Sequence, residues 1–423
     1  MKLTLKNIGK IREASVELNG ITVIAGENNT GKSTVGRTLF SVFNSFYCIQ
    51  DKIREERIES VGNIIEKLCF DTVNWLIQSD IAEGIAAQLI DNKDLEKDDT
   101  EKIGGEVIRL LTRMDEEFEE QMTEEEIDEY VLRIKDLLCV SDMDIFKNTL
   151  EKKLTAEFNG QINNIFSDTT GEIQLQIRGD NLEIELQENH VSEIKNRVSL
   201  RTEAVYIDDP FVLDTIPKSS VFRNPFGQRL EAANHRAHLK EKLYGKKDTN
   251  LMEEIVVNNK IETIYEKIAT VCGGDIVQRK RSGIGYRRKG SEKALDVKNL
   301  STGLKTFVIL KMLLQNGVIE HNGTLILDEP EIHLHPEWQL LFAELIVLIQ
   351  KEFNLHVLLN THSPYFLRAI QVYSAQYEAA DKCKYYLAEV ENEQAYMTDV
   401  TENIEKIYQK LSRPLQKLED TRC

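Results

Sequence analysis

An eight-residue segment near the amino terminus has the composition and spacing of a loop that holds phosphate groups. Residues 26–33 read Gly-Glu-Asn-Asn-Thr-Gly-Lys-Ser and match GxxxxGK[ST] in full. The glycines let successive backbone N–H groups point at phosphates, Lys32 reaches the β- and γ-phosphates, and the Ser33 hydroxyl coordinates Mg²⁺. The residues expected to bind the nucleotide here are Asn28, Asn29, Thr30, Gly31, Lys32, Ser33 and Thr34.

Two carboxylates follow an apolar segment much further along the chain. Residues 324–327 read Thr-Leu-Ile-Leu and are predicted to form a strand, which Asp328 and Glu329 follow. Such a strand delivers Asp328 to a bound metal, and Glu329 beside it can polarise a water for attack on the γ-phosphate. Because strands often end in acids, it is the phosphate loop in the same chain that makes this pair a strong indication of nucleotide hydrolysis.

Two more segments lie on either side of this strand in the sequence. Ser301 and Gly303 stand two residues apart at the start of a predicted helix, where backbone N–H groups bind anions. Taken alone, that segment would be an ordinary helix cap. His362 follows the next predicted strand, 356–360, in the segment Asn-Thr-His-Ser-Pro. A lone histidine is usually structural, so its position after the Asp-Glu strand is what makes it a candidate.

Together, the four segments resemble the ABC ATPases, with Ser301 and Gly303 as the signature and His362 as the switch histidine that contacts the γ-phosphate. Residues 328–336, Asp-Glu-Pro-Glu-Ile-His-Leu-His-Pro, resemble the form found in SMC/RecF-like and overcoming-lysogenisation-defect (OLD)-like AAA ATPases. The resemblance covers about residues 1–45 and 270–375. It implies ATP and Mg²⁺ as cofactors, Ser33 and Asp328 as metal ligands, and the catalytic residues Glu329, His362 and Lys32.

The family also implies an assembly. Its members sandwich two ATP molecules between two subunits, head to tail, so Ser301 and Gly303 would act on the other subunit's nucleotide in a homodimer or a higher oligomer. The sequence departs from the family in two ways. First, Thr302 and Leu304 replace the Gly and Gln of transporter signatures. Second, no convincing Q-loop glutamine is present, and Gln50 and the segment 206–210 are weak candidates.

The remaining elements predict an α/β fold, an ABC-type P-loop NTPase core with a mixed sheet, helical crossovers and an inserted α-helical subdomain. The expected strands are 172–177, 182–186, 204–207, 324–327 and 356–360, and the expected helices are 251–271, 302–315 and 337–352. We expect four parts: 1–50 of the core, an acidic helical insert over 51–167, the rest of the core over 168–383, and a tail over 384–423. The tail is predicted to hold a strand pair and a charged helix.

Charge is spread unevenly along the chain. The formal net charge is −18, from 71 acidic and 53 basic residues, which argues against a protein that coats nucleic acid with its whole surface. Within 115–129, ten of fifteen residues are acidic, which predicts a solvated helix face or loop. Residues 278–293 hold seven basic residues and one acid and form a predicted hairpin centred on 282–285. This hairpin either contacts nucleic acid or supports the signature helix as a solvated structure.

Other residue patterns predict a cytoplasmic protein without a membrane segment. No run approaches 18 apolar residues, and the six cysteines lack metal-site spacing. His235 and His238 form an HxxH pair without a third ligand in sequence, so we interpret them as histidines on a helix surface rather than a metal site.

For the biological role, the leading hypothesis is an ATPase that passes its nucleotide state to a separate effector, such as a nuclease or toxin. It resembles the ATPase subunits of two-gene anti-phage systems, Septu-like or PARIS-like. Few residues follow Pro364, too few for the Toprim nuclease that many OLD-like proteins carry. The alternative is a RecF/SMC-like DNA-repair or chromosome clamp. A transporter ATPase is a weaker third hypothesis, since residues 328–336 and the long acidic insert argue against it.

Overall fold

The chain divides into two compact units. The computed structural model describes residues 1–114, 124–167, 169–196, 198, 200–215, 234–245, 251–279 and 283–420. The first unit comprises Met1–Tyr47 and Leu150–Cys423, and the second comprises Cys48–Thr149. The division into four domains stays a prediction. None of the described helices combines the length and the apolar composition needed to cross a bilayer.

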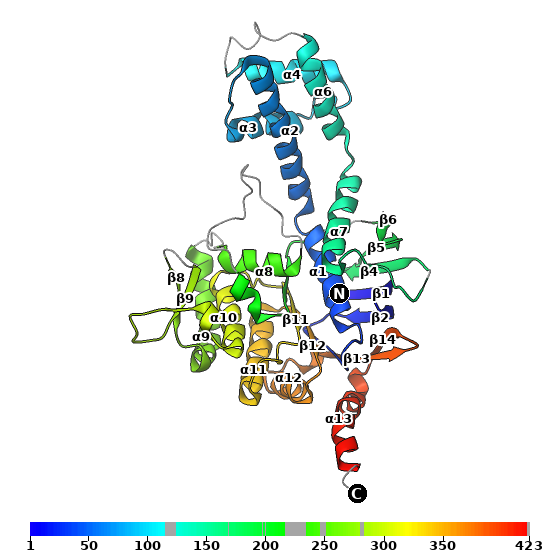
Figure 1. The fold of residues 1–423 in the computed structure, drawn as a ribbon, viewed down its shortest axis with the longest axis vertical. Helices are drawn as coiled ribbons and strands as arrows, with labels where there is room; N and C mark the ends of the chain where they lie inside the picture. The colour runs from blue at the N-terminus through cyan, green and yellow to red at the C-terminus, as the bar shows by residue number, and fades with distance from the viewer. Residues whose placement is uncertain are drawn as a thin grey trace. The chain divides into compact units, whose positions relative to one another are not determined.

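A mixed sheet forms the centre of the first unit. In the described part of the chain it has eleven strands, in the order β6-β5-β4-β1-β2-β14-β13-β3-β12-β11-β7 (Figure 1). Five consecutive strands of it are parallel: β13 (Lys384–Glu391), β3 (Ile21–Gly26), β12 (His356–Thr361), β11 (Thr324–Asp328) and β7 (Ala204–Ile207). The other strands are β1 (Lys2–Ile8), β2 (Ile11–Glu17), β4 (Gly171–Ile177), β5 (Asp180–Gln187), β6 (His190–Lys195) and β14 (Gln394–Asp399). The predicted α/β class and mixed sheet are therefore confirmed.

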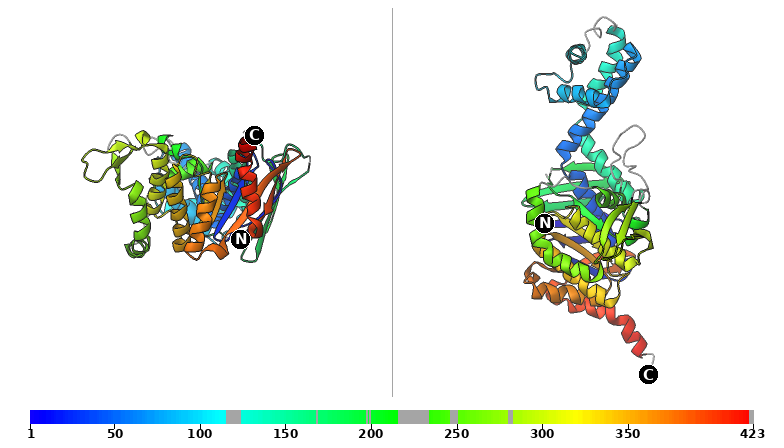
Figure 2. Two further views of the ribbon diagram at one scale, coloured as in Figure 1. Left: turned by 90° about the horizontal axis from the view of Figure 1, so that it is seen from below. Right: turned by 90° about the vertical axis from the view of Figure 1, so that its left-hand side faces the viewer.

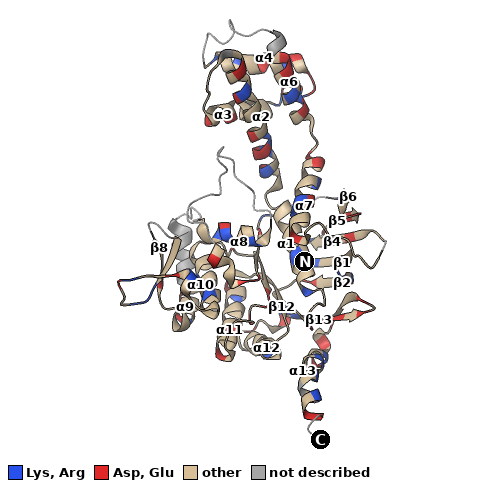
Figure 3. Cartoon of the chain, viewed as in Figure 1, with Lys and Arg blue, Asp and Glu red and all other residues tan. Residues whose placement is uncertain are grey.

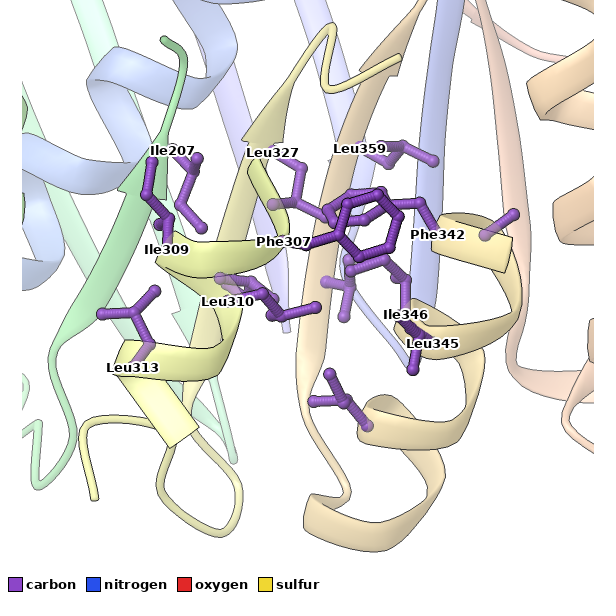
Figure 4. Close-up of a cluster of buried hydrophobic side chains, with 14 of the residues drawn as sticks. Ile207, Phe307, Ile309, Leu310, Leu313, Leu327, Phe342, Leu345, Ile346 and Leu359 are labelled. Atoms are coloured by element: carbon purple, nitrogen blue, oxygen red, sulfur yellow. The ribbon is translucent and has the colours of Figure 1, made fainter. Parts of the chain in front are cut away.

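Helices cover both faces of the parallel strands. Helices α10 (Thr302–Gln315), α11 (Pro336–Phe353) and α12 (Pro364–Gln376) lie along one face (Figures 1 and 2). Phe307 of α10 and Phe342 of α11 meet at 5.5 Å between ring centroids, against Leu327 and Leu359 of the sheet (Figure 4). Strands β3, β11 and β12 are apolar along most of their length because both faces are covered.

Helix α1 (Lys32–Phe46) packs on the opposite face. At Gly36, a Cβ would lie 3.1 Å from Ile326 of β11 and 3.2 Å from the Tyr206 hydroxyl of β7, so a glycine allows this close approach. Asn44 exchanges two hydrogen bonds with the backbone of Ala204. These contacts fix the helix that follows the phosphate loop against the strands that carry the other candidate residues.

Further elements of the first unit lie around this core. They are α7 (Asp142–Phe158, from Leu150), α8 (His235–Tyr244), α9 (Leu251–Val271), α13 (Glu405–Asp420) and the short 3₁₀ helices Pro210–Thr215, Val297–Asn299, Ala380–Lys382 and Thr401–Asn403. A separate three-stranded sheet has the order β10 (Leu295–Asp296), β9 (Gly283–Arg287) and β8 (Asp275–Arg279). The predicted strands, helices and tail elements correspond to observed ones within a few residues.

The second unit is helical. It contains α2 (Ile49–Val73), α3 (Ser79–Asp91), α4 (Thr100–Thr112), α6 (Glu124–Cys139) and the start of α7. Buried residues such as Leu68, Ile85, Val107 and Ile134 share one core. Residues 115–123 of the acidic run 115–129 lie outside the described residues. The rest of the run, 124–129, forms the start of α6. The predicted insert, 51–167, ends later than this unit, which ends at Thr149. Helix α7 begins in the second unit and continues into the first.

Candidate nucleotide site

The phosphate loop connects β3 to α1 and needs its glycines for two different reasons. A Cβ on Gly26 would lie 2.5 Å from the Ala388 carbonyl oxygen, so only glycine fits beside β13. Gly31 has φ +79°, in the left-handed region where L side chains are strained, and a Cβ there would also crowd Ile11. Asn29, with φ +62°, is a non-glycine residue in the same region. The loop is thereby curled at the start of α1, where backbone N–H groups bind anions.

The Lys32 ammonium is held inside this loop. Only 4% of Lys32 is exposed, and its Nζ donates to the Gly26 carbonyl at 3.2 Å and the Glu27 carbonyl at 2.8 Å. The same Nζ lies 3.4 Å from Oε1 of Glu329. A buried cation beside an anion-binding helix start is suited to phosphate, which would compete with Glu329 for it.

Asp328 is fixed from two sides at the carboxyl end of β11. Its Oδ1 accepts a hydrogen bond from Asn360 Nδ2 at 2.9 Å, and its Oδ2 accepts one from the Tyr206 hydroxyl at 2.9 Å. Each oxygen keeps a free lone pair, so the carboxylate can act as a metal ligand. The described residues form no cluster of three or more His, Cys, Asp or Glu that could hold a metal. A Mg²⁺ site completed by phosphate and water needs only the Ser33 hydroxyl and this one carboxylate.

Glu329 and His362 meet beside Lys32. His362 Nδ1 lies 3.4 Å from the Glu329 Oε1 that also faces the lysine. Contact with His362, together with Lys32, lowers the pKa of Glu329, and contact with Glu329 raises the pKa of His362. Glu329 has φ +50° and its N–H donates to the Asn360 carbonyl at 2.9 Å, so this strained backbone is held by β12. We call Lys32, Asp328, Glu329 and His362 the strand-end cluster.

Glu331 supports the loop that carries His362, a role that the sequence did not reveal. It is buried, and its Oε1 accepts hydrogen bonds from the Thr361 hydroxyl and, at 3.3 Å, from the His362 N–H. Burial raises the pKa of Glu331. Glu331 is part of the segment 328–336, but the sequence does not predict its contacts with Thr361 and His362, because they depend on how the chain packs.

The signature residues lie in an open groove of their own. Ser301 precedes α10 with no side-chain capping bond, and a Cβ on Gly303 would lie 2.8 Å from the His333 carbonyl oxygen. The groove is lined by Ser301, Thr302, Gly303, His333, His335 and Trp338, and we call it the signature groove. No residue of the phosphate loop lines it. The structure thus brings Lys32, Glu329 and His362 into contact but places Ser301 and Gly303 elsewhere.

The interpretation of His235 and His238 as surface histidines was wrong, because both are buried. His235 lies between Glu157 and Asp208, and His238 bonds to Glu203 at 2.8 Å. Burial opposes protonation of His235, but the two carboxylates prevail and raise its pKa to about 9. Of the weak Q-loop candidates, Gln50 lies on α2 of the second unit, whereas segment 206–210 supplies the Tyr206 bond to Asp328.

The basic hairpin differs from the prediction in its centre. Residues 283–285 belong to strand β9, so the connection between β8 and β9 is at 280–282, outside the described residues. Arg287 lies 3.4 Å from Asp275, while Arg288, Lys289 and Lys293 are exposed in the segment after β9. Figure 3 colours the Lys and Arg residues of the chain blue.

Comparisons with known proteins assign the family. The model of the AAA ATPase domain family matches residues 1–367. The chain belongs to this family. This confirms the AAA ATPase resemblance indicated by the motifs. The match includes all four segments of the candidate site.

Individual relatives are more distant. The "Retron Vc95 probable ATPase" of Vibrio cholerae serotype O1 biovar El Tor is 31% identical over 94 residues, which is 20% of this chain and 17% of that protein. Among solved structures, the SMC head domain from Thermotoga maritima aligns over 94% of this chain and 98% of that one, with 12% identity and TM-score 0.36. An SMC head bound to the C-terminal winged-helix domain of ScpA aligns over 94% and 97%, with 11% identity and TM-score 0.43.

Proposed function

We propose that this protein hydrolyses ATP in a Mg²⁺-dependent reaction at the strand-end cluster. The observation that carries the proposal is that Lys32 Nζ and His362 Nδ1 each lie 3.4 Å from one carboxylate oxygen of Glu329. The proposed base, Glu329, is thereby next to a cation that can bind phosphate and a histidine that can contact the γ-phosphate. All three side chains can then act on the same γ-phosphate.

Each residue of the site has a separate role in the proposed reaction. The loop N–H groups and Lys32 bind the phosphates, and Ser33 and Asp328 hold Mg²⁺, which neutralises phosphate charge when bound. Phosphate draws Lys32 away from Glu329 and leaves the carboxylate free to accept a proton from the attacking water. The lowered pKa of Glu329 keeps it in the proton-accepting form. His362, held by Glu331, contacts the γ-phosphate.

The signature groove serves a second subunit in this proposal. Ser301 is exposed at the start of α10 and Gly303 lines the same groove, which contains no phosphate-loop residue. In a head-to-tail homodimer, or an oligomer built from such dimers, they contact the γ-phosphate held by the partner's loop. A monomer binds ATP without completing a site.

The ATP-dependent assembly signals to a separate effector, such as a nuclease or toxin, in anti-phage defence. The 31% identity to the retron ATPase over 94 residues supports this role. The exposed Arg288, Lys289 and Lys293 favour a second candidate, a RecF/SMC-like clamp that binds DNA. Changing these three residues to Glu abolishes salt-sensitive DNA binding if the second candidate is correct, and changes nothing if the ATPase has no nucleic-acid ligand.

Phosphate release by wild type and Glu329→Gln tests the ATPase proposal. Because the amide cannot accept the proton, we expect turnover to fall about 10²- to 10⁴-fold while ATP affinity is retained. Normal turnover in the variant would contradict the catalytic role of Glu329.

A further inference from the structure

Behind Asp328 lies a buried tyrosine that the proposed reaction does not use. Tyr206 is 1% exposed on β7, paired in register with Ile326 of β11, and its hydroxyl donates to Asp328 Oδ2 at 2.9 Å. The hydroxyl occupies space left by Gly36, where a Cβ would come within 3.2 Å of it. Both the donor and the room for it are therefore built into the core.

The ring of Tyr206 is held in turn by a charged histidine. His235 stacks on it with ring centroids 4.4 Å apart and planes 26° from parallel. The backbone N–H and Nδ1 of His235 bond to the two oxygens of Glu157 at 2.5 and 2.7 Å, and its Nε2 lies 3.0 Å from Asp208 Oδ2. A cationic ring against an aromatic face adds attraction to the packing.

His235 is the first residue of α8, which is anchored at further points. Asn234 caps the helix by accepting a bond from the Ala237 N–H at 3.0 Å. One turn on, His238 bonds to Glu203, which also pairs with Lys242. The chain of contacts thus runs from α8 through His235 and Tyr206 to the carboxylate of Asp328.

We propose that Tyr206 is a positioning residue for Asp328, and that His235 fixes Tyr206, so that the placement of α8 sets how well the site binds Mg²⁺. A donor behind a metal-ligating carboxylate fixes its orientation, and Tyr206 supplies that donor here. The inference rests on the proposed metal role of Asp328.

Tyr206→Phe tests the first step because it removes one hydroxyl and keeps the stacked ring. The measurement is the Mg²⁺ concentration that gives half-maximal binding of a fluorescent, non-hydrolysable ATP analogue, with a parallel titration in EDTA. We expect that concentration to rise about 10-fold or more, and the affinity in EDTA to stay unchanged.

Tyr244→Phe is the matched control, since the Tyr244 hydroxyl is buried without a hydrogen-bond partner in the described structure. It should leave the Mg²⁺ requirement unchanged. A shift below about two-fold for Tyr206→Phe, an equal loss in EDTA, or the same shift in the control would overturn the inference. A wild type whose analogue binding ignores Mg²⁺ would instead refute the proposed function.

His235→Gln, alone and combined with Tyr206→Phe, tests the second step. If His235 acts through Tyr206, the double variant should need no more Mg²⁺ than Tyr206→Phe alone. Additive shifts would show that His235 acts independently of the tyrosine. If His235→Gln does not fold, which thermal unfolding would reveal, the Tyr206→Phe result still decides the first step.

Discussion

The strand-end cluster and the signature groove differ in how complete they are within one chain. In the cluster, residues from α1 and from the segments after β11 and β12 already touch, and Lys32 and His362 share one oxygen of Glu329. In the groove, Ser301 has no capping bond and faces open space next to His333, His335 and Trp338. The comparison shows that the cluster is assembled within one chain, whereas the groove is open, as we propose for a half-site that a second subunit completes.

The two regions are also built with different constraints. Opposite charges and polar bonds hold the cluster, with Asp328 bonded by Asn360 and Tyr206. The groove depends on close backbone packing, because Gly303 leaves no room for a Cβ beside the His333 carbonyl. Substitutions should therefore separate ATP binding, which needs only the cluster, from turnover, which needs both regions.

The largest expected effect comes from breaking the cluster with Lys32→Ala. Removing the buried cation deletes charge-assisted bonds to the phosphates, and we expect ATP affinity to fall about 100-fold or more. Equilibrium binding of a fluorescent ATP analogue measures this loss. Retention of wild-type affinity would show that Lys32 does not face the nucleotide.

A smaller effect, on turnover only, is expected from Gly303→Ala. The added Cβ would approach the His333 carbonyl oxygen at 2.8 Å and displace the start of α10. We expect phosphate release to fall at least about 10-fold while ATP affinity changes little. Gly84→Ala is the control, because a Cβ there meets nothing within 4 Å. Loss of ATP binding with Gly303→Ala would show that the two regions are not separable.

The smallest effect concerns pH and the charge pair within the cluster. Glu329 raises the pKa of His362, so their pairing is fully present below the unfolded-state pKa of about 6.5 and is lost as pH rises through the folded value. The difference in melting temperature between wild type and His362→Gln should shrink as pH rises above about 6.5. A difference that is constant from about pH 5.5 to 9, or grows with pH, would contradict the pairing.

Much of the first unit was predictable because its local patterns are strong. Strands 204–207, 324–327 and 356–360 are apolar since both faces of the sheet are covered, and the motifs follow the strand ends where they must meet. Strand β6 (His190–Lys195) was missed. Only Val191 is fully buried in it, so there was no alternation to read.

The residues that support the site could not be found from local pattern. Tyr206 and Asp328 are 122 positions apart, and Glu157 reaches His235 across 78. Helix α8 was predicted to be a surface helix because the carboxylates that contact its histidines come from other segments, namely Glu157 from α7 and Glu203 and Asp208 from either side of β7. Long-range packing of polar groups leaves no periodicity in the sequence, and this is why the histidine prediction failed.

Mixing two defective subunits tests most directly the claim that the two regions work in different chains. Lys32→Ala disables the cluster, and Ser301→Arg blocks the groove, so neither protein alone should release phosphate. A head-to-tail heterodimer has one site with both defects and one with neither. We therefore expect the mixture to recover phosphate release as the heterodimer forms. No recovery in samples shown by native mass spectrometry to contain the heterodimer would contradict the account.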